Sequence, residues 1–160
     1  MFRDVDEKCS VPRSPVADGA LLIVNGESMH PLISCGEWVK VRTDRTVSAG
    51  ECCVFRFGRS LLLHRLIMRK NGWCWLWGDN AGTIEHVPAG DIVAFVSDGR
   101  SMLFHAGMVF VSSFALLLRR KDGTIPYRVY IARKKIVKIL ADSDRIFKKV
   151  KDTMFGLAVR

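Results

Sequence analysis

Short apolar runs separated by glycine-containing turns extend over residues 20–97 and limit this part of the chain to a β-fold. The runs are rich in β-branched and aromatic side chains. Gly58-Arg59 and Asn71-Gly72 suit backbone positions with positive φ, so both pairs are predicted to close tight hairpins. The predicted strands cover residues 21–25, 38–42, 52–57, 61–68, 73–77 and 92–96.

The segment after the first predicted strand, Asn25-Gly26-Glu27-Ser28-Met29-His30-Pro31, contains a candidate nucleophile. Gly26 allows a sharp backbone turn, and Pro31 fixes φ just downstream. Ser28 is therefore expected at an exposed junction between strand and turn, a position that suits a nucleophile. Because the same residue types are common in ordinary turns, the assignment depends on the rest of the chain.

Three further blocks follow in order: residues 50–55 with the vicinal pair Cys52-Cys53, then His64-Arg65-Leu66-Ile67, then Gly78-Asp79-Asn80. Together with the serine segment they resemble the signal peptidase I and LexA-type superfamily of serine peptidases, over residues 21–96. The serine segment is most similar to the LexA and phage-repressor branch. The two later blocks are similar to the branch of endoplasmic-reticulum and archaeal-type signal peptidases. The resemblance implies a mainly β, signal peptidase/LexA-like domain in which a serine attacks an amide.

His64 is the predicted general base. The resemblance puts the base of the histidine-type peptidases at this position, and no lysine lies between Lys40 and Lys70 to form a lysine dyad. Strand alternation places His64 on the same face as Leu62 and Leu66, where it would be partly sheltered. A lone histidine in a strand is also a common structural residue.

A carboxylate after residue 77 is expected to orient the imidazole and complete a triad. Asp79 is the first candidate and Glu85 the alternative, since histidine-type relatives tend to carry another acid shortly after the Gly-Asp-Asn block. Asp79 could instead cap a turn. The backbone N–H of Ser28 is the predicted oxyanion donor, because Gly26 stands where lysine-type enzymes supply a hydroxyl.

No metal or cofactor is predicted. His30 is interpreted as a surface or substrate-side residue, and His86 and His105 lack neighbours that could act as ligands. The five cysteines are an odd number and contain no Cys-x-x-Cys spacing, so neither a disulfide framework nor a zinc site is indicated. This pattern favours a reducing compartment.

The positive charge is concentrated at the end of the chain. Of the net +9, residues 119–160 contribute 13 Lys/Arg against 4 Asp/Glu, whereas residues 1–118 carry 12 of each. Residues 102–118 contain no charged side chain, but the stretch is near the lower limit for a membrane helix. It could span the bilayer, lie along it or complete the β-domain. Near-helical spacing in the tail predicts a basic amphipathic helix, with apolar residues Ile136, Leu140, Phe147, Val150 and Met154.

An anionic membrane surface is the predicted partner of this tail, and a helix packed on the β-domain is the alternative. Nucleic acid is not favoured, because no recognition motif accompanies the charge. The predicted location is therefore membrane-associated, either peripheral or through a single C-terminal segment, with the cytoplasm as the alternative. Three parts are expected: a flexible N-terminus over 1–18, a peptidase-like β-domain over 19–99, and a hydrophobic segment with the basic tail over 100–160.

Two classes of function remain open. The first is a serine endopeptidase of signal peptidase type, which would cleave leader or pro-segments of peptides or proteins bound in an extended conformation. The second is a LexA-like regulatory protein or a non-catalytic peptide-binding module on the same fold. Self-cleavage is disfavoured, because only 27 residues precede Ser28.

Overall fold

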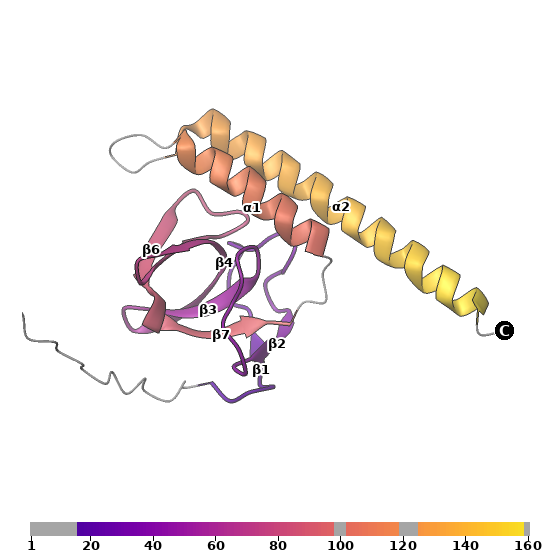
Figure 1. The fold of residues 1–160 in the computed structure, drawn as a ribbon, viewed down its shortest axis with the longest axis horizontal. Helices are drawn as coiled ribbons and strands as arrows, with labels where there is room; N and C mark the ends of the chain where they lie inside the picture. Colours follow the sequence, from indigo (N-terminus) through magenta and orange to yellow (C-terminus); the bar gives the residue numbers. More distant parts are fainter. Residues whose placement is uncertain (1–15, 98–101, 119–124, 159–160) are drawn as a thin grey trace, which may run out of the picture.

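A curled antiparallel sheet forms the body of the protein, as the computed structural model of residues 16–97, 102–118 and 125–158 shows (Figure 1). Within these residues seven strands pair in the order β1-β2-β7-β3-β4-β5-β6, and two helices follow. The strands are β1 (Leu21–Ile23), β2 (Trp38–Arg42), β3 (Cys52–Phe57), β4 (Ser60–Lys70), β5 (Trp73–Trp77), β6 (Ile84–Pro88) and β7 (Ile92–Val96). A short 3₁₀ turn, η1 (Ala89–Asp91), precedes β7, and the helices are α1 (Met102–Leu117) and α2 (Tyr127–Ala158). The predicted mainly β class is confirmed.

The two predicted hairpins are also confirmed, because Gly58, Asn71 and Gly72 all have positive φ, at 60°, 51° and 75°. The six predicted strands are present within a few residues of their predicted ends. Strand β6 was not predicted, since it mixes Glu85 and His86 with its apolar residues and ends in Pro88. A proline is tolerated there because β6 lies at the edge of the sheet.

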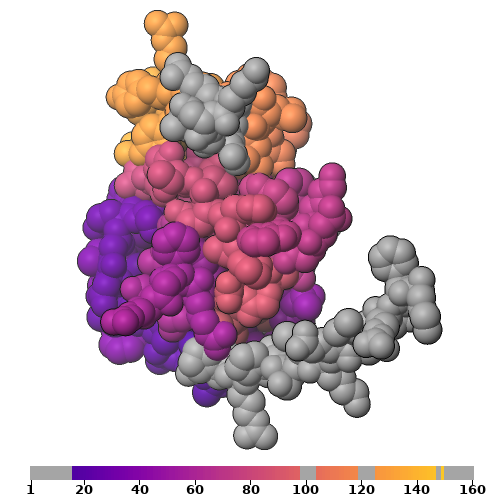
Figure 2. Space-filling view, turned by 90° about the vertical axis from the view of Figure 1, so that its left-hand side faces the viewer, coloured from indigo at the N-terminus to yellow at the C-terminus, as the bar shows by residue number. Residues whose placement is uncertain are grey.

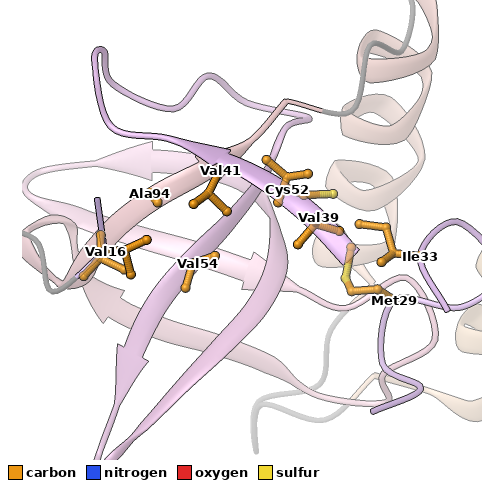
Figure 3. Close-up of a cluster of buried hydrophobic side chains, with 10 residues drawn as sticks. Val16, Met29, Ile33, Val39, Val41, Cys52, Val54 and Ala94 are labelled. Atoms are coloured by element: carbon orange, nitrogen blue, oxygen red, sulfur yellow. The ribbon is translucent and has the colours of Figure 1, made fainter. Parts of the chain in front are cut away.

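The residue after the candidate nucleophile is anchored in the core. Met29 is 1% exposed and packs with Ile33 and Val39 in a cluster that also contains Cys52 and Val54 (Figure 3). Burying a methionine side chain contributes about 2 kcal/mol. This anchor fixes the turn that carries Ser28. Most of the predicted flexible N-terminus lies outside the described residues, and Val16 belongs to the same buried cluster.

The helices α1 and α2 lie side by side as a layer on the sheet (Figures 1 and 2). Phe104 and Met108 of α1 pack against Val137 and Ala141 of α2. Of the predicted stripe, Leu140 packs against this cluster, whereas Ile136 is 39% exposed, so the most buried positions of α2 lie one residue later, at Val137 and Ala141. The side chains of the other predicted stripe residues Phe147, Val150 and Met154 lie outside the described residues. Among the described helices, none is long and apolar enough to cross a membrane.

Helix α1 closely approaches the loop before β3 at Gly50. A Cβ atom on Gly50 would lie 2.6 Å from the backbone oxygen of His105, and Gly50 has a φ of +91°. The Gly50 carbonyl accepts hydrogen bonds from Arg65 and from Nδ1 of His105, the latter at 2.9 Å. Only glycine fits this contact without a shift of the helix.

We expect Gly50→Ala to lower the free energy of unfolding by more than Gly58→Ala. Both substitutions add a Cβ at positive φ, at a cost of about 1–2 kcal/mol, but a Cβ on Gly58 has no atom within 4 Å. The clash with α1 should add about 1–3 kcal/mol at Gly50. Urea denaturation of both variants measures the difference, and equal losses would show that α1 does not pack at Gly50.

Candidate active site

Ser28 lies in the turn that follows β1. It is half-buried, between the exposed Glu27 and the buried Met29. Gly26 has a φ of 155°, a conformation that residues with a side chain rarely adopt, which explains the glycine in this turn. The N–H of His30 donates to Glu27 O at 3.1 Å and closes the turn around the serine. Among the described residues, the Ser28 N–H has no hydrogen-bond acceptor, so this donor is available to a ligand.

The Gly78-Asp79-Asn80 segment holds the serine turn in place. The backbone N–H of Asn80 donates to Ser28 O at 2.7 Å, and its side-chain amide donates to Glu27 O at 3.1 Å. Residues more than fifty positions apart are thereby joined through their backbones. The position of Ser28 depends on the position of this second turn.

Gly78 brings Ser28 and His64 together. A Cβ atom on Gly78 would lie 2.7 Å from Ser28 O and 2.9 Å from His64 Nε2, closer than Cβ atoms approach other atoms in real proteins. Gly78 follows directly after β5, whose last residue Trp77 pairs with Arg65 of β4. The absent side chain leaves the space in which the imidazole and the serine turn meet.

His64 and Glu85 form a close pair across the end of β5. His64 Nδ1 lies 2.7 Å from Glu85 Oε2, and the hydroxyl of Thr83 donates to the other carboxylate oxygen at 3.2 Å. His64 is 5% exposed and lies beside the ring of Phe55, on the sheltered face that alternation predicts. Within the described part of the chain, no hydrogen bond joins Ser28 Oγ to His64. The free Nε2 atom faces Gly78 and the serine turn.

Asp79 has different partners. Its carboxylate accepts two hydrogen bonds from the guanidinium of Arg65, at 3.0 and 2.7 Å, and both side chains are fully buried. Nη2 of Arg133 lies 3.6 Å from Asp79 Oδ1. Of the two candidate acids, Glu85 is therefore the one that contacts the imidazole.

Arg133 of α2 is buried in the same region. Burial lowers the pKa of its guanidinium to about 10, while the carboxylate of Asp79 opposes this shift. At neutral pH the side chain is still a cation, and it lies over the ring of Trp77 at 3.8 Å. Sequence reasoning missed this residue, because a tail arginine among many cations predicts only a charged surface.

Neither the other histidines nor the cysteines take part in the His64–Glu85 pair, although Cys53 of β3 lies opposite His64 of β4 in the sheet. His86 stacks on Trp73 and Trp75, and His30 is exposed. Cys52, Cys53 and Cys74 are buried free thiols, and burial raises the pKa of Cys53 well above its ordinary value. In the part of the chain that the structure describes, no three His, Cys, Asp or Glu residues gather in a way that could hold a metal ion.

An apolar groove of about 440 Å³ leads to Ser28. One wall is the edge strand β1, the other is the first part of β4, and Gly26 and Ser28 lie in its lining. Among the described residues no strand pairs with the outer edge of β1, so the backbone of β1 can pair with an added extended segment. The lining residues are Leu21, Leu22, Ile23, Val24, Asn25, Gly26, Ser28, Met29, Trp38, Val39, Val54, Leu61, Leu62 and Leu63.

The curled sheet, with a serine turn beside a His–Glu pair, defines a serine-peptidase-like fold. Residues 3–91 match the model of the family described as Peptidase S24-like, so the chain belongs to this family. The match fits the predicted LexA and signal peptidase-type superfamily and covers Ser28, His64, Asp79 and Glu85. A search of curated proteins found no match to the chain.

We expect Asp79→Asn to destabilise the fold strongly. The substitution keeps the shape of the side chain but leaves Arg65 and Arg133 without their buried counter-charge, at a cost of about 3–5 kcal/mol. Glu85→Gln is the matched control, because Glu85 is more exposed and has no arginine partner among the described residues. Urea denaturation compares the two variants. A loss for Asp79→Asn no larger than that for Glu85→Gln would contradict the structural role of Asp79.

Proposed function

We propose that this protein is a serine endopeptidase in which Ser28 is the nucleophile, His64 the general base and Glu85 the residue that orients the base. The observation that carries the proposal is the position of His64. Its Nδ1 is held by Glu85 at 2.7 Å, while its Nε2 and Ser28 O meet at Gly78. Catalytic hydrogen bonds are often long in proteins without substrate, so the Ser28–His64 contact is expected to tighten when a peptide binds.

The chemistry follows from these positions. His64 Nε2 takes the proton of Ser28 Oγ as the oxygen attacks the peptide carbonyl, and the imidazolium gives this proton to the leaving amine. Water then attacks the acyl-enzyme with His64 again as base, which releases the new carboxyl end and restores the serine. The carboxylate of Glu85 stabilises the imidazolium in both steps. The free N–H of Ser28 would stabilise the oxyanion.

The groove beside β1 supports an extended peptide as the substrate. Backbone pairing with the open edge of β1 would provide affinity without selecting a sequence, and the apolar lining would select side chains at alternate positions. Such a geometry suits a flexible segment of a larger protein. Together with the resemblance to signal peptidases, it favours leader or pro-segments as substrates.

We expect Ser28→Ala and His64→Ala each to abolish cleavage, and Lys70→Ala to leave it unchanged. Glu85→Gln should lower kcat by about 10²- to 10⁴-fold, because the imidazolium loses its carboxylate partner. The assay is mass spectrometry of a peptide library after incubation with each purified variant, whose circular dichroism confirms the fold. Full activity of His64→Ala would overturn the assigned base.

The second candidate function is a non-catalytic peptide-binding module. It is favoured by the lack of a hydrogen bond between Ser28 Oγ and His64 in the described residues. Under this alternative the wild-type protein binds extended peptides in the groove and cleaves none, and Ser28→Ala binds them equally well. Cleavage that depends on Ser28 excludes it.

We propose in addition that α1 binds an anionic membrane surface. Phe110, Phe114 and Leu117 recur on one face of α1 and are 75%, 58% and 82% exposed. No charged residue interrupts α1, and the basic run Arg119-Arg120-Lys121 follows it in the sequence. Apolar side chains next to excess positive charge suit the boundary between the lipid headgroups and the acyl chains. Each nearby cation adds about 1 kcal/mol to the free energy of binding to anionic lipid.

Vesicle flotation tests this second proposal. The protein should bind vesicles that contain phosphatidylserine, bind neutral vesicles weakly, and be released by salt. Phe110→Ser/Phe114→Ser should lose most of the binding, whereas the control Trp73→Ser changes an exposed aromatic residue outside α1 and should keep it. Equal binding of both variants would contradict the assignment of α1. Resistance to carbonate would mean insertion in place of surface binding.

A further inference from the structure

Helix α2 contacts the back of the candidate active site through a buried arginine. Nη1 of Arg133 donates to the carbonyl oxygens of Gly78 and Asp79, at 3.1 and 3.2 Å. Its Nε donates to Ser112 Oγ of α1 at 3.3 Å, and the side chain is 2% exposed. One guanidinium therefore connects both helices to the turn that holds the serine.

A second side chain of α2 contacts the same turn. The hydroxyl of Tyr130 donates to Asn80 O at 3.1 Å. Tyr130 and Arg133 lie one helical turn apart and so project from one face of α2. Between them they bond to the carbonyls of all three residues Gly78, Asp79 and Asn80.

We propose that Arg133 is a positioning residue for Ser28: α2 fixes the Gly78–Asn80 turn, and this turn fixes the nucleophile and the free face of the imidazole. The inference rests on the proposed function, since it assigns a role in the same site. The route consists of short contacts only. Arg133 bonds to Gly78 O, the position of a Cβ on Gly78 lies 2.9 Å from His64 Nε2, and Asn80 N–H bonds to Ser28 O.

Arg133 lies outside the part of the chain that matches the family model. The family match ends at residue 91, whereas Arg133 lies in a helix far beyond it. The β-domain supplies Ser28, His64 and Glu85, and its Ala81 N–H donates to Gly78 O at 3.1 Å; α2 supplies a second donor to Gly78 O and the donor to Asp79 O. Displacement of α2 would remove the donors that Arg133 and Tyr130 provide and would loosen the turn. The helical layer is therefore part of the site as well as a cover for the sheet.

The test compares Arg133→Met, Arg133→Lys and the control Lys134→Met, which changes the exposed neighbour on the same helix. Arg133→Met should lower kcat by about 10- to 100-fold with KM little changed, because the serine is misplaced while the groove is intact. Arg133→Lys should restore part of the loss, since an ammonium can donate to one of the two carbonyls. Lys134→Met should behave as the wild type.

Amide exchange of Asn80, followed by NMR, gives a readout that needs no activity. The Asn80 N–H is protected by its bond to Ser28 O, so its exchange should become faster in Arg133→Met and stay unchanged in Lys134→Met. If Arg133→Met does not fold, Tyr130→Phe is the second variant, because it removes only the hydrogen bond from the Tyr130 hydroxyl to Asn80 O. It should lower kcat and speed the exchange at Asn80, both to a smaller extent.

The outcomes separate this inference from the proposed function. A folded Arg133→Met variant with wild-type kcat and wild-type exchange at Asn80 overturns the positioning role. Equal loss of activity in Arg133→Met and Arg133→Lys, with unchanged exchange at Asn80, also overturns it. If the wild-type protein cleaves no peptide, the peptidase proposal fails, and the exchange experiment still decides whether α2 fixes the turn.

Discussion

The buried carboxylate of Asp79 is the interaction on which the rest of the structure depends. Two guanidinium groups face it, one from β4 and one from α2, and Asp79 and Arg65 are fully buried. Burial of three charges costs several kcal/mol for each ion unless every group is well paired. Backbone carbonyls supply further acceptors: Gly50 for Arg65, and Gly78 and Asp79 for Arg133. The cluster therefore forms only when the sheet, the two turns and α2 are all in place.

Two glycines make this arrangement sterically possible. Gly50 lets α1 approach the sheet, and its carbonyl accepts a bond from Arg65. Gly78 lets the serine turn approach His64. In both places a methyl group would push apart the elements that the buried charges hold together. Close packing of backbone against backbone and buried ion pairing are thus coupled in this fold.

Much of the sheet could be predicted from local signals. The glycine-containing turns and the β-branched runs predicted six strands and both hairpins correctly. Positive φ and the alternation of side chains along a strand each depend on only a few neighbouring residues. Strand β6 was missed because an edge position tolerates Glu85, His86 and Pro88, which together hide the strand pattern. The role of Arg133 could not be predicted either. Its contacts with Gly78 and Asp79 join residues more than fifty positions apart, and the sequence around Arg133 contains only the repeated cations of a surface helix.

The choice between Asp79 and Glu85 shows why spacing alone could not assign the acid. Both follow β5 in the sequence, but only Glu85 contacts His64. The charge of Asp79, however, is already balanced by a bidentate arginine, with a second arginine close by, so it has little attraction left for an imidazolium. Glu85 has only Thr83 and His64 as described side-chain partners. Its negative charge is free to stabilise the proton that His64 would accept, whereas Asp79 stabilises the turn that holds Ser28. In the proposed mechanism the two acids therefore have separate tasks, and the arginines determine which acid has which task.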